Sequence, residues 1–219
     1  SRTRGQHPLH ERNTLMIAIV DYGVGNLFSL KSSFAMIGAD IITTSDEAVI
    51  RQADRIVLPG VGAFEDAAAK LRATGLDKVV CELAAEGKPI LGICLGMQML
   101  FDRSLEYGEH PGLGLIPGTI RPIADVIGPD LKIPHIGWNA LHILRDDPIF
   151  KYVEEGECVY YVHSFYGKDC EASTLATSEY GLSVTGVVRQ GLVWGTQFHP
   201  EKSGTVGLQI LRNFCEMEG

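Results

Sequence analysis

The sequence predicts an α/β fold in which a mostly parallel central sheet is flanked by helices. From Met16 to Ile93, short apolar runs alternate with segments of helical periodicity. Strands that alternate with helices in this way form parallel sheets covered on both faces. After a Gly/Pro-rich loop at residues 107–118, strand-like runs become more frequent. We therefore expect an additional β-rich C-terminal half.

The first half contains four predicted strands with helices between them. The strands are expected at residues 16–21, 41–44, 55–58 and 89–93. The helices are expected at residues 27–37, 46–53 and 63–87. Gly38 ends the apolar periodicity of the first helix, and Ser45 is the expected cap of the second. Gly75 is expected to divide the third segment into two helices.

The second half contains a predicted hairpin and a final helix. Strand-like runs are expected at residues 159–165, 183–189 and 192–197, and Gln190-Gly191 joins the last two. The final helix spans about Gly204 to Met217, with apolar residues along one side. Because no linker or repeat divides the chain, residues 16–219 are expected to form one domain. The polar residues 1–15 are expected to be a disordered leader.

Composition narrows the class of partner. The chain has 219 residues, 45% of them hydrophobic, and a formal net charge of −8, which argues against an extended nucleic-acid or anionic-membrane surface. No apolar run approaches the about 18 residues of a membrane span. The five cysteines form no CxxC pair, which predicts free thiols in a cytoplasmic protein and no zinc site. The expected partners are small molecules or proteins.

Cys94 stands between Gly92 and Gly96, where an apolar run passes into helix-like sequence. This pattern is typical of a nucleophile elbow, whose strained strand-to-helix turn leaves no room for a β-carbon two residues before or after the nucleophile. The turn would place the sulfur at a helix N-terminus, which favours a thiolate, and would leave the NH of Leu95 free to bind an oxyanion. The alternative is an inert core cysteine, and Cys94 alone does not decide between them.

His199 and Glu201 complete a candidate catalytic group about a hundred residues downstream. In an extended segment, residues two apart point to the same face. The Glu201 carboxylate can therefore hold one imidazole nitrogen of His199 while the other nitrogen faces Cys94. This arrangement matches the nucleophile, base and orienting group of covalent acyl transfer. His-x-Glu alone is a weak signal, but it is strong in combination with Gly-x-Cys-x-Gly-x-Gln and an upstream Pro-Gly-Val-Gly.

Together these motifs resemble the class I (triad) glutamine amidotransferases over residues 16–217. The resemblance implies a flavodoxin-like fold and a glutaminase without metal or cofactor. It implies that Cys94 is the nucleophile, His199 the general base and acid, and Glu201 the orienting carboxylate. The residues that it places in the glutamine pocket are Gly60, Gln98, His163, Ser164 and Phe165. Phe165 stands where the family more often has Tyr.

The segment Pro59-Gly60-Val61-Gly62 is the expected switch of the oxyanion hole. It follows a strand that we place beside the elbow strand, so its backbone can reach the reacting carbonyl. Glycines on both sides of Val61 let the Val61–Gly62 peptide rotate with little steric resistance. We expect the NH of Gly62 to join that of Leu95 as a donor when the partner binds.

Further motifs narrow the resemblance to the branch that delivers ammonia to a separate (β/α)8 cyclase in histidine biosynthesis. They are Asp21–Leu27, Pro59–Phe64, Pro134–Asn139 and Val162–Ser164. The resemblance implies a heterodimer with that cyclase and glutamine as substrate. Trp138 lies in the Pro/Gly-flanked segment Pro134–Asn139, which is expected to be a loop without a periodic pattern for burial, so it is expected to anchor the interface. Asn26 is expected to contribute to the same interface.

Two alternatives remain open. Triad amidotransferases of pyridoxal phosphate, anthranilate or GMP synthesis share the chemistry and differ in the acceptor of ammonia, but they fit the motifs of the narrower branch less well. A non-catalytic regulatory member of the fold would typically lack part of the triad. This chain has all three residues.

Overall fold

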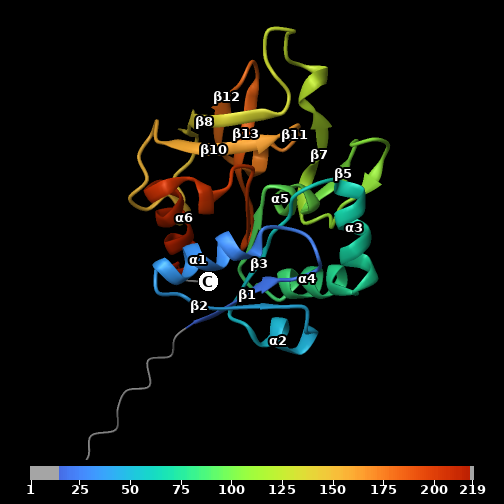
Figure 1. Cartoon of the computed structure of the whole chain (residues 1–219), viewed down its shortest axis with the longest axis vertical. Coiled ribbons are helices and arrows are strands. Elements are labelled where there is room, and N and C mark those ends of the chain that lie inside the picture. Colours follow the sequence, from blue (N-terminus) through green and yellow to red (C-terminus); the bar gives the residue numbers. More distant parts are fainter. Residues whose placement is uncertain (1–14, 218–219) are drawn as a thin grey trace, which may run out of the picture.

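The computed structural model describes residues 15–217, which form a large central sheet and two smaller ones (Figure 1). The central sheet has eight strands in the order β2-β1-β3-β4-β14-β13-β12-β9. Their bounds are β1 Met16–Val20, β2 Asp40–Thr44, β3 Arg55–Leu58, β4 Ile90–Ile93, β9 His142–Ile143, β12 Thr174–Glu179, β13 Ser183–Gln190 and β14 Val193–Thr196. The pairings from β2 to β14 are parallel, and those from β14 to β9 are antiparallel. The predicted α/β class with a mostly parallel sheet is confirmed.

Helices cover both faces of this sheet (Figure 1). Their bounds are α1 Leu27–Met36, α2 Glu47–Gln52, α3 Phe64–Ala73, α4 Leu76–Ala85, α5 Leu95–Met99 and α6 Gly204–Glu216. Ile17 and Ile19 of β1 belong to the buried cluster that holds the apolar side chains of α1 and α6. Ala18 and Val20 belong to a second cluster, shared with α2, α3 and α4. Because side chains alternate along a strand, one strand contributes to both cores.

Two smaller sheets lie in the upper part of the molecule in Figure 1, beside β12 and β13 of the central sheet. One pairs β8 with β10, and the other has the order β11-β7-β5-β6. Their bounds are β5 Phe101–Ser104, β6 His110–Pro111, β7 Ile116–Pro122, β8 His135–Ala140, β10 Cys158–His163 and β11 Phe165–Lys168. Short 3-10 helices connect the elements, namely η1 Ile123–Asp125, η2 Pro148–Phe150, η3 Glu171–Ser173 and η4 Pro200–Lys202.

Several predicted elements are confirmed. Gly75 separates α3 from α4 and has a φ of 73°, in the left-handed region where glycine is favoured. The hairpin is present as β13 and β14. Helix α6 buries Ile210, Leu211 and Phe214.

Other predictions are wrong in detail. The cap of α2 is Asp46, whose carboxylate accepts from the Ala48 NH at 2.9 Å, and not Ser45. The single strand expected over 159–165 is broken at Ser164 into β10 and β11, which belong to different sheets. The segment Pro134–Asn139, expected as a loop, forms most of β8. The prediction of a leader at residues 1–15 lies outside the described residues except for Leu15.

Residues 15–217 contain five free cysteines. None of the helices in this range combines the length and the apolar character needed to cross a bilayer.

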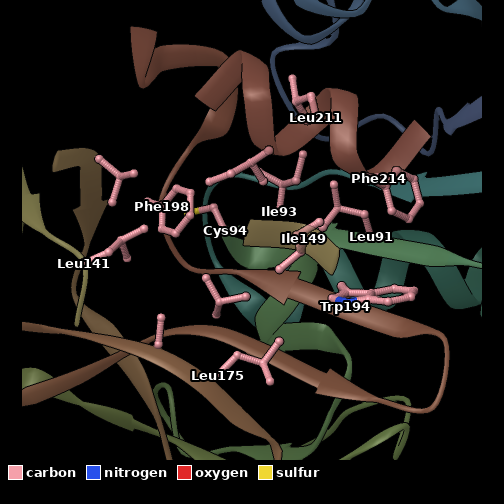
Figure 2. Packing of buried hydrophobic residues seen from close by; sticks show 14 of the residues in the cluster. Leu91, Ile93, Cys94, Leu141, Ile149, Leu175, Trp194, Phe198, Leu211 and Phe214 are labelled. Carbon is pink, nitrogen blue, oxygen red and sulfur yellow. The ribbon is translucent and has the colours of Figure 1, made fainter. Parts of the chain in front are cut away.

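The turn after β4 is held by close backbone packing. A β-carbon on Gly96 would lie 1.9 Å from the carbonyl oxygen of Leu58, and one on Gly92 would lie 2.8 Å from the carbonyl oxygen of Gly96. Both glycines are therefore required by sterics, as the elbow pattern predicts. Figure 2 shows Cys94 next to Phe198, and both residues belong to one buried hydrophobic cluster.

We expect Gly96→Ala to lower the free energy of unfolding by about 3 kcal/mol or more, because overpacking against backbone cannot be relieved by a side-chain rotation. Urea denaturation followed by circular dichroism measures the change. Gly128→Ala is the matched control, since a β-carbon there meets nothing within 4 Å. Equal stability of the two variants would contradict this account of the elbow.

Candidate active site

Cys94 occupies a strained turn between β4 and α5. Its φ of 55° and ψ of −112° are unfavourable for a residue with a β-carbon. The NH of Cys94 donates to the carbonyl of Thr196 at 2.7 Å, and its carbonyl accepts from the NH of Gln98 at 3.1 Å. These bonds, together with the close packing of Gly96, hold the residue in this conformation. The side chain is only 6% exposed, so its chemistry depends on the few groups around it.

His199 and Glu201 form a buried pair. Nδ1 of His199 lies 2.6 Å from Oε1 of Glu201, and the two side chains are 4% and 6% exposed. The contact predicted from the His-x-Glu spacing is confirmed, although Glu201 lies in the 3-10 helix η4 and not in an extended segment. Nδ1–H therefore donates to the carboxylate, and Nε2 is the nitrogen left for chemistry. Nε2 is buried and has no hydrogen-bond partner among the described residues.

The charge state of His199 is set by opposing effects. Burial disfavours the imidazolium, but the Cys94 sulfur and the Glu201 carboxylate favour it, and the pKa of His199 is raised above its ordinary value. A raised pKa favours a protonated imidazole beside the sulfur. That is the charge state required of an acid that gives a proton to a leaving group.

The NH of Leu95 is not free, and here the prediction is wrong. It donates to the carbonyl of Gly60 at 3.3 Å, so this carbonyl oxygen occupies the position in front of the donor. The preceding peptide is held separately, because the hydroxyl of Tyr22 donates to the carbonyl of Pro59 at 2.6 Å. The unit that must rotate to expose the NH of Leu95 is thus the Gly60–Val61 peptide. Gly62 follows this peptide and has a φ of 98°, in the left-handed region.

A cavity of about 440 Å³ opens over the sulfur. Most of the predicted site residues line it, namely Gly62, Cys94, Leu95, Gln98, His163, Ser164, Phe165 and His199. Gly60 does not line it and faces Leu95 instead. Glu201 lies behind His199, away from the cavity wall.

Gln98 and Gln197 form a hydrogen-bonded bridge to the nucleophile. Nε2 of Gln98 donates to the carbonyl of Phe165 at 3.3 Å and to Oε1 of Gln197 at 3.1 Å. Nε2 of Gln197 in turn lies 3.8 Å from Sγ of Cys94 and donates to it. The role of Gln197 was missed from the sequence, although the residue stands two positions before His199. It lies just beyond the end of β14 at Thr196, so no strand pattern in the sequence marks it.

Glu106 is a second residue that the sequence did not reveal. It lines the cavity, is 6% exposed, and burial raises the pKa of its carboxyl. A buried carboxylate next to an open cavity favours a cationic ligand group. No local pattern marks this position, because Glu106 lies in the irregular segment after β5.

The two residues predicted at the partner interface lie on the surface. Trp138 is 55% exposed on β8, with its ring centroid 5.8 Å from that of Tyr160. The expectation that Trp138 is not a core residue is confirmed. Asn26 is exposed and caps α1 by accepting from the NH of Ser29 at 3.3 Å.

Comparison with known proteins identifies the family. The sequence model described as "Glutamine amidotransferase class-I" matches residues 18–217. The chain is 47% identical over 202 residues to "Imidazole glycerol phosphate synthase subunit HisH" of Listeria monocytogenes serotype 4a, covering 92% of this chain and 96% of that protein. It is 48% identical over 206 residues to the protein of the same name in Syntrophotalea carbinolica, covering 92% and 100%.

Solved structures agree on the fold. A glutamine amidotransferase aligns with a TM-score of 0.71 at 19% identity, over 91% of this chain and 97% of that chain. The structure of PurLQS from Thermotoga maritima aligns with a TM-score of 0.71 at 19% identity, over 92% and 97%. The chain therefore belongs to the class-I glutamine amidotransferase family, in which its relatives of 47% and 48% identity are HisH subunits of imidazole glycerol phosphate synthase.

Proposed function

We propose that this chain is a glutaminase subunit that hydrolyses glutamine through a Cys94 thioester and passes ammonia to a cyclase subunit. That partner would make imidazole glycerol phosphate and AICAR in histidine biosynthesis. The observation that carries the proposal is the buried pair of His199 and Glu201 beside a strained cysteine in a cavity wall. The identity to HisH subunits supports this choice of partner.

In the proposed reaction, the Cys94 thiolate attacks the carbon of the glutamine side-chain amide. The carbon–nitrogen bond breaks as His199 gives its proton to the nitrogen, and ammonia leaves. Water then attacks the glutamyl thioester, His199 accepts a proton, and the carbon–sulfur bond breaks to release glutamate. Glu201 holds the imidazole in position and stabilises its charged form in both steps.

The cavity suggests how glutamine is held. We assign the buried carboxylate of Glu106 to the α-ammonium group, because this pairing would offset the desolvation of both charges. His163, Ser164 and Phe165 form the facing wall. Both amide hydrogens of Gln98 are already used within the protein, so its proposed part is to hold that wall through the carbonyl of Phe165.

The position of the Gly60 carbonyl suggests how activity is gated. Rotation of the Gly60–Val61 peptide would remove this carbonyl from the NH of Leu95 and direct the NH of Val61 toward the same point. Two donors would then face the oxyanion. This scheme makes the NH of Val61 the second donor in place of that of Gly62. Because Gly62 has no β-carbon, its backbone dihedral angles could change to accommodate the rotation. One missing donor costs about 3 kcal/mol in the transition state.

The partner surface is proposed on β8. Ile136 and Trp138 are 56% and 55% exposed and lie on the same side of the strand, two residues apart. Large aromatic residues in such positions are frequent anchors of protein interfaces. Asn26 is proposed to contribute from the start of α1.

We expect Cys94→Ala to abolish glutamine-dependent synthesis by the complex and to leave ammonia-dependent synthesis unchanged, because only the release of ammonia passes through the thioester. Product formation is measured with each nitrogen donor at alkaline pH, where free ammonia is abundant. Equal loss with both donors would contradict the division of labour between the subunits.

We expect Glu201→Gln to lower both the pKa of His199 and the glutaminase kcat, because burial then acts without the carboxylate that opposes it. The pKa is read from the ring signals of His199 by NMR between about pH 5 and about pH 11, because that of the wild-type residue is raised to about 10. The expected loss in kcat is about 10²-fold to 10⁴-fold. Glu155→Gln is the matched control, because it removes a carboxylate 2.8 Å from Nδ1 of the exposed His142. An unchanged pKa of His199 would refute the assigned role of Glu201.

We expect the partner with its ligand to raise the glutaminase kcat about 10²-fold to 10³-fold, while the rate at which iodoacetamide alkylates Cys94 stays nearly constant. Alkylation needs the thiolate but develops no oxyanion, so it separates the two causes of activation. Parallel increases in both rates would show that the partner activates the thiol and not the oxyanion hole.

A further inference from the structure

Two buried histidines outside the proposed catalytic pair lie in direct contact. Nδ1 of His135 is 2.8 Å from Nε2 of His163. The other nitrogen of His135, Nε2, is 2.8 Å from Oδ1 of Asn139. The other nitrogen of His163, Nδ1, is 2.7 Å from the carbonyl oxygen of Phe165. All four ring nitrogens of the pair are therefore engaged in short contacts.

Both outer partners are acceptors. The carbonyl of Phe165 has no proton to give, so Nδ1 of His163 must be the donor. The orientation of the Asn139 amide is fixed because its Nδ2 donates to the carbonyl of Glu179 at 2.9 Å. Oδ1 of Asn139 therefore faces His135, and Nε2 of His135 must also be a donor.

The central contact then requires a third proton. If both rings were neutral, their single protons would be used on the outer partners, and two lone pairs would face each other at 2.8 Å. A hydrogen bond at this distance forms only when one of the two nitrogens is protonated. Three protons on two imidazoles make one of them an imidazolium.

The surroundings assign the charge to His135. Its ring stacks on Tyr180 with centroids 3.9 Å apart and on Tyr161 with centroids 4.9 Å apart. The faces of phenol rings stabilise a cation. Burial lowers the pKa of both histidines, and it lowers that of His163 to about 4, so His135 is the ring that accepts the third proton more readily. Burial alone opposes this charge on His135, and the short contact with Nε2 of His163, which needs the proton, must offset it.

We propose that His135 is a buried imidazolium at neutral pH that positions the wall of the glutamine cavity by donating to His163. The charged groups on the cavity side are His199, Cys94, Glu106 and Lys202. His199 and Lys202 oppose the new charge, whereas the carboxylate of Glu106, that of Glu201 behind His199 and, when it is ionised, the sulfur of Cys94 favour it. The tyrosine hydroxyls on the other side are bonded to Ser178 and to the carbonyl of Lys132. Among residues 15–217, no carboxylate hydrogen-bonds to either ring, so the charge is held by neutral acceptors and aromatic faces.

The charge acts on the nucleophile through a continuous chain of contacts. His163 and Gln98 both donate to the carbonyl of Phe165, and Gln98 connects to Gln197, which donates to the sulfur of Cys94. Loss of the proton from His135 would break the first bond of this chain and remove one positive charge from behind the cavity wall. The catalytic part of this inference rests on the proposed function, but the protonation state does not.

NMR of the full chain labelled with ¹⁵N in histidine tests the protonation state directly. At about pH 7, we expect both ring nitrogens of His135 to be protonated and His163 to carry a proton on Nδ1 alone. The ring signals are assigned through their own backbone, so no variant is needed. A neutral His135 would overturn the proposal.

His135→Gln tests the use of the charge, because the glutamine amide can donate to His163 but carries no charge. In the complex with the partner, we expect the ratio of wild-type to variant kcat/KM to be about ten at neutral pH, the equivalent of one pK unit. The ratio should fall toward one as the pH rises through the pKa of His135. A ratio that stays constant with pH would indicate a purely structural residue and overturn the role of the charge.

Two further measurements keep the outcome unambiguous. His142→Gln, at an exposed histidine, should leave kcat/KM unchanged at every pH. Thermal unfolding shows whether His135→Gln folds. If the variant does not fold, the NMR measurement on the wild-type chain decides whether His135 is charged. If the wild-type complex had no glutaminase activity, the proposed function would fail while the protonation of His135 would still stand or fall by NMR.

Discussion

The close contact between α5 and β3 is the constraint on which the rest of the site depends. Gly96 approaches the carbonyl of Leu58 so closely that no β-carbon fits between them. This contact brings the segment after β3 against the start of α5, and so it places the Gly60 carbonyl on the NH of Leu95. The same packing holds Cys94 at a positive φ. Strain at the nucleophile and closure of the oxyanion position therefore have one cause.

The candidate catalytic residues are brought together by strand pairing across the chain. Strands β4 and β14 are parallel neighbours, with Gly92 opposite Gly195 and Ile93 opposite Thr196. Cys94 directly follows β4, and His199 comes shortly after β14, so both lie at the carboxyl edge of the sheet, where open α/β sheets form their sites. Cys94 and Phe198 share one buried cluster, which fixes the two strand ends relative to each other.

Features set by local sterics or periodicity could be predicted from the sequence. The division at Gly75, the hairpin and the contact between His199 and Glu201 all depend on residues close in the chain. The glycines of the elbow follow from a local motif, although the group that excludes a β-carbon at Gly96 is the distant carbonyl of Leu58. The class of the fold follows from the same alternation of strands and helices. The family resemblance implied a site role for Cys94, and its placement in a cavity wall is a property of the structure.

What could not be predicted depends on partners far apart in the chain. The NH of Leu95 is occupied by the carbonyl of Gly60, which lies far earlier in the chain, and no pattern near the elbow indicates it. Gln197 and Glu106 are polar residues in ordinary sequence, and only their burial beside the cavity distinguishes them. The break at Ser164 is marked by no Gly or Pro, and it arises because β10 and β11 pair with strands of different sheets.

Strand β8 joins the surface to this buried site because its two faces have opposite character. On the inner face, Asn139 bonds to His135, which in turn contacts His163. On the outer face, Ile136 and Trp138 are exposed. The inner face is connected to Cys94 by hydrogen bonds through the carbonyl of Phe165 and the two glutamines. A displacement of the strand must therefore break or stretch buried hydrogen bonds, at a cost of about 1–3 kcal/mol for each group left without a partner. A protein bound to the outer face that prefers one position of β8 thus changes the free energy of the arrangement around the sulfur, without touching the cavity itself.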